Sequence, residues 1–370
     1  MNYIDGSVDA GIITTITFHG TKSKGAAENT VPLLFLRVDD TKWEEKMEQE
    51  MLTYEDIRSA YERIQKHVIQ TPLEKSIYLS SEQKEVFLKL ECQQISKAFK
   101  VRGAFNRMLM LTEEEKKRGV AAISSGNHGI AVAYAAKKLR MKNAVILVPE
   151  NTPESKIEKI RYYGGEVHLL GQCFDEANLL GMQYIEEHGF TFIDGWDNDP
   201  LVYAGQGTVG LELMTQLADL DTILVPIGGG GLCTGIAVAA KSIRPDIRVI
   251  GLYSEACTAW PDSIRDHTIY NDYPSRDSVC EAMVGGIGHL SYRMHHWIDD
   301  SLMVSEQNIK KAMLHAVLNE KIVAEAAGAV PIGAMLQYGD QIPGKKIALI
   351  ISGGNVKNEL LIHEMKATTC

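Results

Sequence analysis

The sequence predicts an α/β protein built on a mostly parallel β-sheet that is wrapped by helices. Short apolar segments of strand length alternate with longer segments of helical periodicity over most of the chain, as expected for strand–helix–strand units. Three of the apolar segments lead directly into the small-residue turns SSGN, PIGGGG and SGGN. Because ligands in such sheets bind at the carboxyl ends of the strands, these turns indicate where a functional site would lie.

The predicted elements follow one another in a regular order. An amphipathic helix begins at Thr53, its N-cap, with Asp56 in the first turn, and stops near Thr71-Pro72. Strands are expected in EVFLKL, GVAAIS, AVILVP, EVHLL, FTFID, TILVPI, RVIGLY and KIALII. Helices are expected from about Lys100, in GIAVAYAAKKL, from Thr152-Pro153, in FDEANLLGMQYI, around GTVGLELMTQL and from Gly231.

Composition narrows the class of protein. With 370 residues, of which 45% are hydrophobic, the chain can bury a sizeable core or two smaller ones. A net charge of -10 without a basic stripe argues against nucleic acid or an anionic membrane surface as a partner. No apolar run approaches the roughly 20 residues that a membrane span needs. We therefore expect a small-molecule ligand.

The cysteines and the N-terminal segment add two further expectations. The cysteines are scattered without a CxxC pair, which favours reduced thiols in a cytoplasmic protein; they are Cys92, Cys173, Cys233, Cys257, Cys280 and Cys370. Residues 1–50 mix short apolar stretches with Gly, Thr and Lys and show no sustained period. We expect them to form a flexible N-terminal extension.

The glycine turn is the clearest ligand signal. Gly228 to Gly231 lie between an apolar strand and a helix, where successive backbone N–H groups and the helix N-terminus suit a phosphate. No Gly-Lys-Ser/Thr follows, and Cys233 or Thr234 stands where a GxGxxG motif has its last glycine, so ATP and NAD are disfavoured. A tight turn without a ligand remains the alternative.

Lys100, in AFKVRGAF, is the second signal. Taken alone, such a lysine is usually a solvated surface residue. A lysine that forms a Schiff base needs its pKa lowered by desolvation or by a nearby cation, which Phe99 and Arg102 are placed to supply respectively. Together, the phosphate turn and the lysine suggest covalently held pyridoxal 5'-phosphate.

Six motifs in order now resemble a known family: AFKVRGAF, SSGNHGIAVAYAA, AGQGTVGLEL, PIGGGGL, EAAGAVPIGA and ISGGN. They resemble the fold type II pyridoxal-phosphate enzymes, in particular the threonine/serine dehydratase and serine racemase group, from about Met51 to the C-terminus. The resemblance implies two doubly wound open-sheet domains, tryptophan synthase β-like, with the cofactor in the cleft between them. The large domain would comprise residues 51–111 and 191–370 and the small domain residues 112–190, in a homodimer.

The resemblance also implies the cofactor contacts. Lys100 would form the Schiff base, and Ser352 would face the pyridine nitrogen, which a hydroxyl cannot protonate as a carboxylate would. The cofactor is then a weaker electron sink, which suits the expulsion of a β-substituent. The remaining contacts would be Phe99 beside the ring, Asn127 on the phenolic oxygen, and Gly228, Gly229, Gly230, Gly231 and Leu232 on the phosphate.

The SSGNH turn begins a helix, whose N-terminus suits the substrate carboxylate. The expected contacts there are Ser124, Ser125, Asn127 and His128. In the resembling racemases a serine at the position of Ser125 is the acid/base opposite the lysine, whereas many threonine dehydratases have alanine there. A small capping residue is the alternative, so Ser125 permits racemisation without establishing it. Glu255 and Glu325 are expected near the cofactor.

The chain departs from the family pattern at three places. Asn178 stands where eukaryotic serine racemases place a substrate-clamping arginine, and residues 280–282 read CEA in place of ADG. Glu212 matches the glutamate of a divalent cation site found in some members, but Ala218 replaces the expected aspartate. A bound Mg²⁺ or Ca²⁺ is therefore unsupported, since such ions require several oxygen ligands.

These features predict a cytoplasmic dehydratase, that is, an ammonia-lyase. It would convert the β-hydroxy amino acids L-threonine and/or L-serine to a 2-oxo acid and ammonia by α,β-elimination. The chain ends soon after ISGGN, which favours a catabolic over a feedback-controlled enzyme. The alternatives are a serine or related amino-acid racemase, a β-replacement synthase, and a protein that binds pyridoxal phosphate without catalysis.

Overall fold

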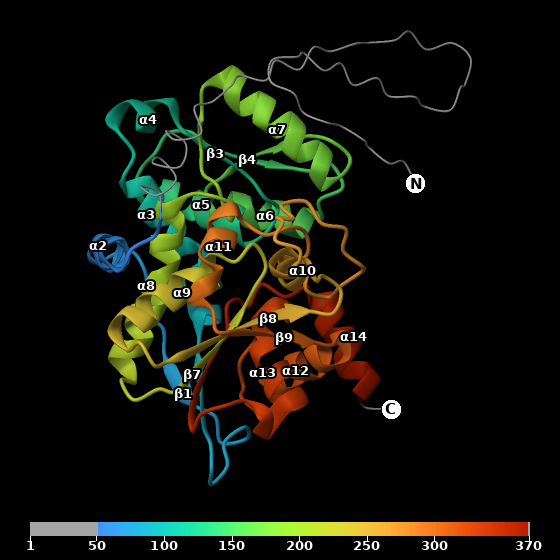
Figure 1. The fold of residues 1–370 in the computed structure, drawn as a ribbon. Coiled ribbons are helices and arrows are strands. Elements are labelled where there is room, and N and C mark those ends of the chain that lie inside the picture. Colours follow the sequence, from blue (N-terminus) through green and yellow to red (C-terminus); the bar gives the residue numbers. More distant parts are fainter. Residues whose placement is uncertain (1–50, 369–370) are drawn as a thin grey trace, which may run out of the picture. The chain divides into compact units, whose positions relative to one another are not determined.

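The computed structural model describes residues 51–368 of the chain, and the expected N-terminal extension lies outside this range. Within it the strands form two sheets (Figure 1). The larger has six strands in the order β1-β2-β10-β7-β8-β9. Its strands are β1 (Leu73–Lys75), β2 (Glu85–Lys89), β7 (Thr222–Pro226), β8 (Arg248–Ser254), β9 (Asp300–Val304) and β10 (Lys346–Ile350). All neighbours pair in parallel except β1 and β2.

The smaller sheet has four parallel strands in the order β5-β4-β3-β6. They are β3 (Val120–Ile123), β4 (Ala144–Val148), β5 (Glu166–Leu169) and β6 (Thr191–Phe192). The α/β fold with mostly parallel sheets is thus confirmed. The division into a small domain of residues 112–190 and a large domain stays a prediction; β6 lies just beyond that boundary.

Helices connect and cover the strands. Helix α2 (Tyr54–Ile64) precedes β1. Between β1 and β6 lie η1 (Glu91–Gln93), α3 (Lys100–Leu109), α4 (Glu113–Arg118), α5 (Asn127–Lys138), α6 (Glu154–Tyr163) and α7 (Phe174–His188). The later ones are α8 (Pro200–Gln216), α9 (Gly231–Ile243), α10 (Ala259–Arg265), η2 (Glu281–Met283), α11 (His289–Arg293), η3 (His295–Trp297), α12 (Glu306–Leu318), α13 (Ala326–Tyr338), η4 (Gly339–Gln341) and α14 (Asn358–Thr368). No helix within residues 51–368 is long and apolar enough to cross a membrane.

Most predicted elements are present, and their ends follow local chemistry. Thr53 and Asp56 form a capping box at the start of α2, as expected. The helix ends at Ile64, however, and the expected end near Thr71-Pro72 is wrong. Helix α8 begins at Pro200, earlier than expected, because the Asp199 carboxylate caps its first backbone N–H groups. Strands β1 and β9 are absent from the predicted elements, and the DSLMV segment of β9 has only a short apolar run. Helices α4, α10, α12, α13 and α14 are not among the predicted elements either.

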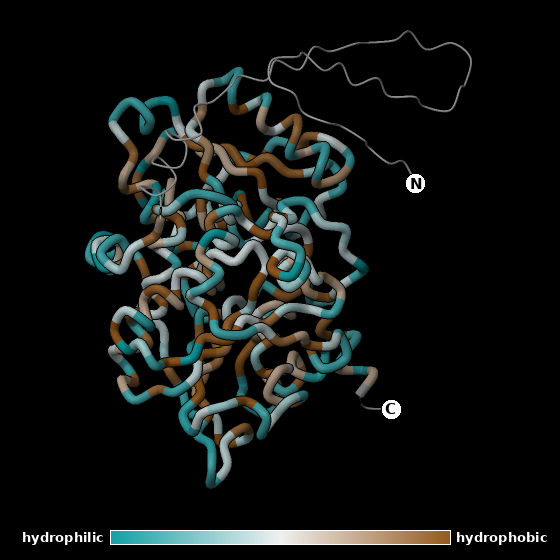
Figure 2. Tube along the Cα trace, in the orientation of Figure 1, coloured by the Kyte–Doolittle hydropathy of each residue, from teal (hydrophilic) through white to brown (hydrophobic). Residues whose placement is uncertain are grey.

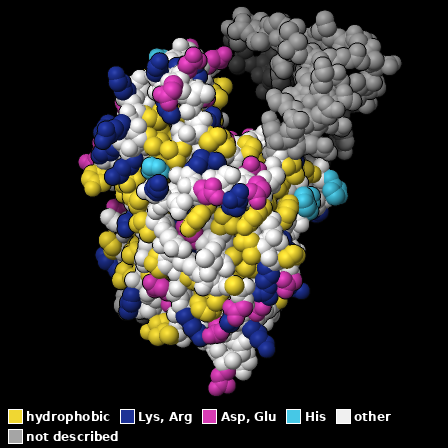
Figure 3. Space-filling model, turned by 90° about the vertical axis from the view of Figure 1, so that its left-hand side faces the viewer, with side chains coloured by type: hydrophobic (Ala, Val, Ile, Leu, Met, Phe, Trp, Pro, Cys, Tyr) yellow, Lys and Arg dark blue, Asp and Glu magenta, His cyan; other side chains and the backbone are white. Residues whose placement is uncertain are grey.

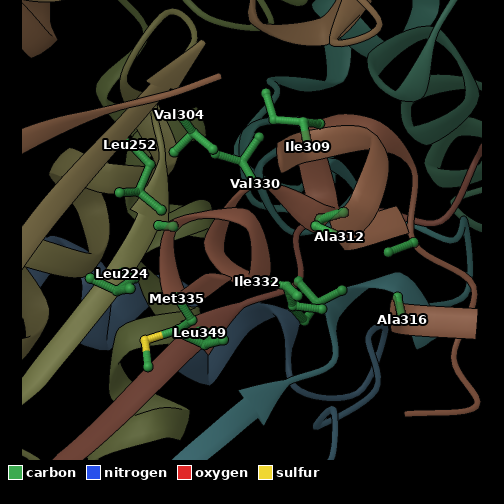
Figure 4. Packing of buried hydrophobic residues seen from close by; sticks show 14 of the residues in the cluster. Leu224, Leu252, Val304, Ile309, Ala312, Ala316, Val330, Ile332, Met335 and Leu349 are labelled. Carbon is green, nitrogen blue, oxygen red and sulfur yellow. The ribbon is translucent and has the colours of Figure 1, made fainter. Parts of the chain in front are cut away.

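The larger sheet buries one face against α12 and α13. Leu224, Leu252 and Leu349 from β7, β8 and β10 meet side chains of both helices (Figure 4). Hydrophobic segments gather along the strands and inner helices, and hydrophilic segments lie on outer turns and on α4 (Figure 2). This burial explains why the strand sequences are almost uninterrupted apolar runs.

Three of the functional motifs follow three neighbouring strands of the larger sheet. Strands β2, β10 and β7 are adjacent and parallel. The AFK segment follows β2 and η1, the SGGN turn follows β10, and the glycine turn follows β7. Their carboxyl ends therefore meet at the same edge of the sheet.

A buried ion network fixes the helix that begins at Lys100. Arg102 donates to both carboxylate oxygens of Glu91 and to both of Glu212, at 2.7–2.9 Å. The Lys89 ammonium donates to Glu212 Oε2 at 2.7 Å, and the four side chains are at most 1% exposed. Burial raises the pKa of Glu91, but the Arg102 guanidinium outweighs it and holds that pKa below its ordinary value. The network joins β2, η1, α3 and α8.

Removing Arg102 leaves two buried carboxylates short of a partner. We expect Arg102→Ala to lower the free energy of unfolding by about 3–5 kcal/mol. Arg107→Ala on the same helix removes a pair with Asp199 whose two side chains are 19% and 18% exposed, so they keep some contact with water, and it should cost about 1 kcal/mol. Denaturant unfolding of both variants measures the difference; equal losses would mean that the buried network does not fix α3.

Candidate active site

Lys100 is the first residue of α3, and its side chain points to the segment that follows β6. The Lys100 ammonium donates to the carbonyl oxygen of Gly195 and lies 5.3 Å from the centre of the Phe99 ring. Burial lowers the pKa of Lys100 to about 8, against a smaller opposing effect of the Asp194 carboxylate. The unprotonated amine is therefore far more abundant near neutral pH than for an ordinary lysine, which favours a nucleophilic role.

The expectation that Arg102 lowers the pKa of Lys100 is wrong. Its guanidinium is directed into the ion network with Glu91 and Glu212, and only burial lowers the pKa of the lysine. Residues two positions apart on a helix face different sides. The desolvation expected around Phe99 is thus the cause that the structure supports.

The segment Asp194 to Trp196 lies between Lys100, the SSGNH turn and the glycine turn. The Asp194 carboxylate accepts hydrogen bonds from the backbone N–H of Trp196 at 3.0 Å and shapes this turn. A Cβ on Gly195 would collide with the His128 ring, and a Cβ on Gly229 would lie 3.0 Å from the Cβ of Trp196. These close approaches bring the three motifs to one site.

The glycine turn needs its glycines. Gly230 has a φ of +95°, in the left-handed region, and a Cβ there would collide with the Ser291 side chain. A Cβ on Gly228 would lie 2.9 Å from the carbonyl oxygen of Ala282. Within residues 51–368, no hydrogen bond uses the backbone N–H groups of Gly228, Gly229 or Gly230. With α9 beginning at Gly231, the turn offers N–H donors to an anion.

Leu232 differs from its glycine neighbours because its side chain belongs to the hydrophobic core. Only its backbone N–H could serve a phosphate. Ser352 is 4% exposed, and its carbonyl oxygen accepts a hydrogen bond of 3.1 Å from the N–H of Phe99. The SGGN turn is thereby tied directly to the segment that carries Lys100.

Asn127, the first residue of α5, is held on both ends of its amide. Its Nδ2 donates to Glu325 Oε1 at 2.7 Å, and its Oδ1 accepts from Asn355 Nδ2 at 2.6 Å. Glu325 precedes α13, and burial raises the pKa of its carboxyl to about 7. Glu255 instead accepts a hydrogen bond from the backbone N–H of Glu306, at the start of α12.

The other residues of the SSGNH turn have unequal donor capacity. Ser124 Oγ accepts from the N–H of Gly126, and Ser124 and Ser125 are both partly exposed. His128 Nε2 lies 2.7 Å from the carbonyl oxygen of Ile193, so Nε2 carries the proton. Burial lowers the pKa of His128 to about 4. In this neutral form Nδ1 accepts but does not donate, which does not suit a carboxylate ligand.

Both carboxylate oxygens of Glu212 accept hydrogen bonds from Arg102, and Oε2 also accepts one from Lys89. Lys89 Nζ also donates to Gln216 Oε1 at 3.0 Å and to the Thr71 carbonyl oxygen at 2.8 Å. Two protein cations thus neutralise this carboxylate. No cluster of three or more His, Cys, Asp or Glu side chains able to hold a metal ion occurs among the residues described.

Sequence reasoning missed Asp194, Trp196, Lys159 and Asn355. The Asp-Gly turn after FTFI carried the same signal as the other motifs, a small-residue turn directly after an apolar strand. Lys159 carried no such signal, because α6 reads as an ordinary charged helix. At the positions that depart from the family pattern, Asn178 is exposed on α7, and Glu281 pairs with Lys156 and Lys357.

These residues fit pyridoxal phosphate on structural grounds. The glycine turn has N–H donors without partners among the described residues, and the pKa of Lys100 is lowered beside it. The amide of Asn127 has a second N–H that Glu325 does not use. The protein supplies an anion cradle, an amine and an oriented amide around one edge of the sheet.

Glu325 makes the free energy of unfolding depend on pH. Its pKa is raised from 4.5 to about 7 on folding, so the folded protein binds this proton more tightly than the unfolded chain. The free energy of unfolding that it contributes is present at low pH and is lost as pH rises through this range. Glu325→Gln does not titrate, so its stability relative to wild type should rise by up to about 3 kcal/mol between pH 4.5 and pH 8. Unfolding curves measured across pH would contradict this if the difference stayed constant.

Comparisons with known proteins show which family the chain resembles over most of its length. Residues 64–353 match the family model described as "Pyridoxal-phosphate dependent enzyme". The L-threonine ammonia-lyase of Thermotoga maritima is 40% identical over 313 residues, covering 83% of this chain and 76% of that protein. The catabolic L-threonine dehydratase of Escherichia coli is 39% identical over 306 residues, which cover 82% of this chain and 92% of that protein. The structure of maize serine racemase superposes with a TM-score of 0.80 at 34% sequence identity, and the match covers 86% of this chain and 98% of that chain.

The family match spans residues 64–353, and the two relatives named above are 40% and 39% identical over 83% and 82% of this chain. Three of the motifs, AFKVRGAF, PIGGGGL and SSGNHGIAVAYAA, supply the amine, the anion cradle and the oriented amide described above. The chain therefore belongs to the pyridoxal-phosphate dependent enzyme family, in its fold type II branch.

Proposed function

We propose that the protein is a dehydratase, or ammonia-lyase, that converts L-threonine and/or L-serine to a 2-oxo acid and ammonia by α,β-elimination. The observation that carries this is Lys100, an amine with its pKa lowered to about 8 beside the glycine turn. Relatives named L-threonine ammonia-lyase and L-threonine dehydratase, at 38–40% identity, support the reaction. A loss of the β-hydroxyl followed by release of ammonia requires no redox partner.

We assign the residues that hold pyridoxal phosphate as follows. Lys100 would bind it as a Schiff base, with Phe99 beside the ring and Ser352 at the pyridine nitrogen. Gly228 to Leu232 would bind the phosphate through backbone N–H groups, and Asn127 would donate to the phenolic oxygen. When bound, the cofactor supplies an electron sink for the substrate α-carbon.

Once the substrate amine has replaced the Lys100 amine on the cofactor, the freed Lys100 amine would also take the substrate α-proton. With a pKa near 8, the amine is close to the operating pH at which a general base is most effective. Gly195, whose carbonyl oxygen accepts from the lysine, would hold the amine in position. Proton transfer at the α-carbon and departure of the β-hydroxyl together give the eliminated product.

The substrate carboxylate would bind at the N-terminus of α5. The first backbone N–H groups of this helix and the Ser124 and Ser125 hydroxyls are the donors there. Asn127 would contribute its amide, whereas the neutral His128 would contribute its backbone N–H rather than its ring.

A racemase is the second candidate, and Ser125 is the observation that favours it. Its hydroxyl follows β3 in the turn that begins α5. The similarity to maize serine racemase supports this alternative, whereas Asn178, in place of an arginine, opposes it. Both reactions begin with removal of the same α-proton.

We further propose a cytoplasmic homodimer with a large and a small domain. The cysteines among the described residues are free thiols, which suits a reducing compartment. Twofold symmetry is the most common arrangement of soluble oligomers. On the face drawn in Figure 3, basic and acidic side chains are interspersed, which supports a small-molecule partner over nucleic acid.

Substitution of Lys100 tests the proposed function. Lys100→Ala should lower 2-oxo acid formation from L-threonine and L-serine by about 10³-fold or more, because base and covalent anchor are both lost. Lys117→Ala, an exposed position on α4, is the control and should behave as wild type. Activity and the cofactor's visible absorbance are measured together. Full activity in the Lys100 variant would exclude the lysine from the chemistry.

Ser125→Ala separates the two candidate reactions. For a dehydratase whose α-proton is handled by Lys100, 2-oxo acid formation should stay within about tenfold of wild type, while any inversion of serine should fall by about 10²-fold or more. Purified protein is given L- and D-serine and L-threonine, and pyruvate, 2-oxobutyrate and inverted amino acid are followed. Wild-type protein that makes D-serine faster than pyruvate would favour the racemase instead.

A further inference from the structure

Four side chains from four parts of the fold form one chain of hydrogen bonds. The Lys159 ammonium on α6 donates to Asn355 Oδ1 in the SGGN turn. Asn355 Nδ2 donates to Asn127 Oδ1 at 2.6 Å, and Asn127 Nδ2 donates to Glu325 Oε1 at 2.7 Å. This hydrogen-bond chain begins at Lys159, which is partly exposed, and ends at Glu325. Burial raises the pKa of the Glu325 carboxyl.

The two ends give this chain a fixed direction. An amide can be reversed, since its oxygen and nitrogen have nearly the same size, but an ammonium only donates and an ionised carboxylate only accepts. Lys159 therefore requires the oxygen of Asn355 to face it. The nitrogen of Asn355 is then turned to Asn127, and it also donates to the Ser96 carbonyl oxygen at 3.0 Å. Both contacts of Asn355 agree with one orientation.

We propose that Lys159 and Asn355 are positioning residues that fix the orientation of the Asn127 amide at the cofactor. With Oδ1 facing Asn355 and one N–H donated to Glu325, Asn127 has one N–H left for the ring oxygen of pyridoxal phosphate. The reversed amide would present an oxygen to that oxygen, which is repulsive. The inference rests on the cofactor contact assigned to Asn127 under the proposed function, and it does not depend on which substrate is used.

Lys159 holds this direction even when Glu325 is protonated. A protonated carboxyl could donate to a reversed Asn127, but the reversal would set Asn127 Nδ2 against Asn355 Nδ2, two donors without an acceptor. The groups that face Glu325 are the Asn127 amide, the backbone N–H of Asn355, the Lys156 and Lys159 ammonium groups and the thiols of Cys92 and Cys280. Among these, Lys159 is the cation that contacts the amide chain directly.

The hydrogen-bond chain from Lys159 to Glu325 also couples the two sheets. Helix α6 follows β4 of the smaller sheet, whereas Asn355 and Glu325 belong to segments beside β10 and α13 of the larger one. Two other contacts fasten α6 to the same side: Lys156 pairs with Glu281 at 3.1 Å, and the Tyr163 hydroxyl donates to the Ile95 carbonyl oxygen at 3.1 Å. The orientation of Asn127 is thus correct only while α6 is docked.

Lys159→Met tests the proposal, because methionine keeps the length of the side chain and removes the donor. We expect the visible absorption band of the bound cofactor to shift and kcat/KM to fall roughly tenfold or more, the size expected for a lost charged hydrogen bond or an outer-shell contact. Lys159→Arg, which also only donates, should restore the wild-type spectrum. Lys156→Met, one turn earlier on α6, is the matched control: it removes a cation and a contact between the sheets but leaves the amide chain intact.

Asn355→Asp gives a second, independent variant. Aspartate still accepts from Lys159 but, when ionised, cannot donate to Asn127 Oδ1, so the Asn127 amide loses the contact that orients it. The spectral shift should exceed that of Lys159→Met. Thermal unfolding of each variant identifies a protein that fails to fold. If Lys159→Met does not fold, Asn355→Asp still tests the amide orientation, because it breaks a different contact of the same hydrogen-bond chain.

Spectra are recorded on protein loaded with pyridoxal phosphate and without substrate, so the outcome is separate from that of the proposed reaction. The proposal is overturned if Lys159→Met, Lys156→Met and wild type share one spectrum, or if Lys159→Arg is as shifted as Lys159→Met. A wild-type protein that binds the cofactor but forms no 2-oxo acid would contradict the proposed function and leave the amide chain standing.

Discussion

The rest of the structure depends on the buried pairing of Arg102 and Lys89 with Glu91 and Glu212. Four charges without access to water are tolerated only because every carboxylate oxygen accepts from a cation. Since the partners come from β2, η1, α3 and α8, their mutual attraction fixes where α3 begins. Lys100 is the first residue of that helix, so the same network sets the position of the amine. The buried ion network therefore fixes the position of a lysine whose pKa is lowered, so that it loses its proton more readily than an ordinary lysine.

Around this lysine the fold concentrates backbone and amide groups rather than charges. The glycine turn offers N–H donors, the Asp194 turn offers a carbonyl oxygen, and Asn127 offers an amide. Such groups are directional and pre-oriented, which is what stabilises charge that appears only during a reaction. The charged groups, Lys159 and Glu325, stand one step further away, where they orient the amides without competing for the cofactor.

Much of this could be predicted from the sequence, because strand ends and small-residue turns are local signals. The strands behind SSGN, PIGGGG and SGGN lie where expected, and their parallel pairing brings the last two motifs together. The role of Arg102 was misjudged because nearness in sequence hides the direction in which a helical side chain points. Lys159 and Asp194 could not be assigned, since their partners are 196 and roughly 100 residues away in the chain and meet them only in the folded protein.

The proposed function requires that the cofactor is bound to Lys100. The most direct measurement is reduction of the pyridoxal-phosphate-loaded protein with borohydride, followed by digestion and mass spectrometric peptide mapping. We expect the stable pyridoxyl label on the peptide that contains Lys100. A label on Lys97, Lys159 or another lysine, with Lys100 unmodified, would contradict it.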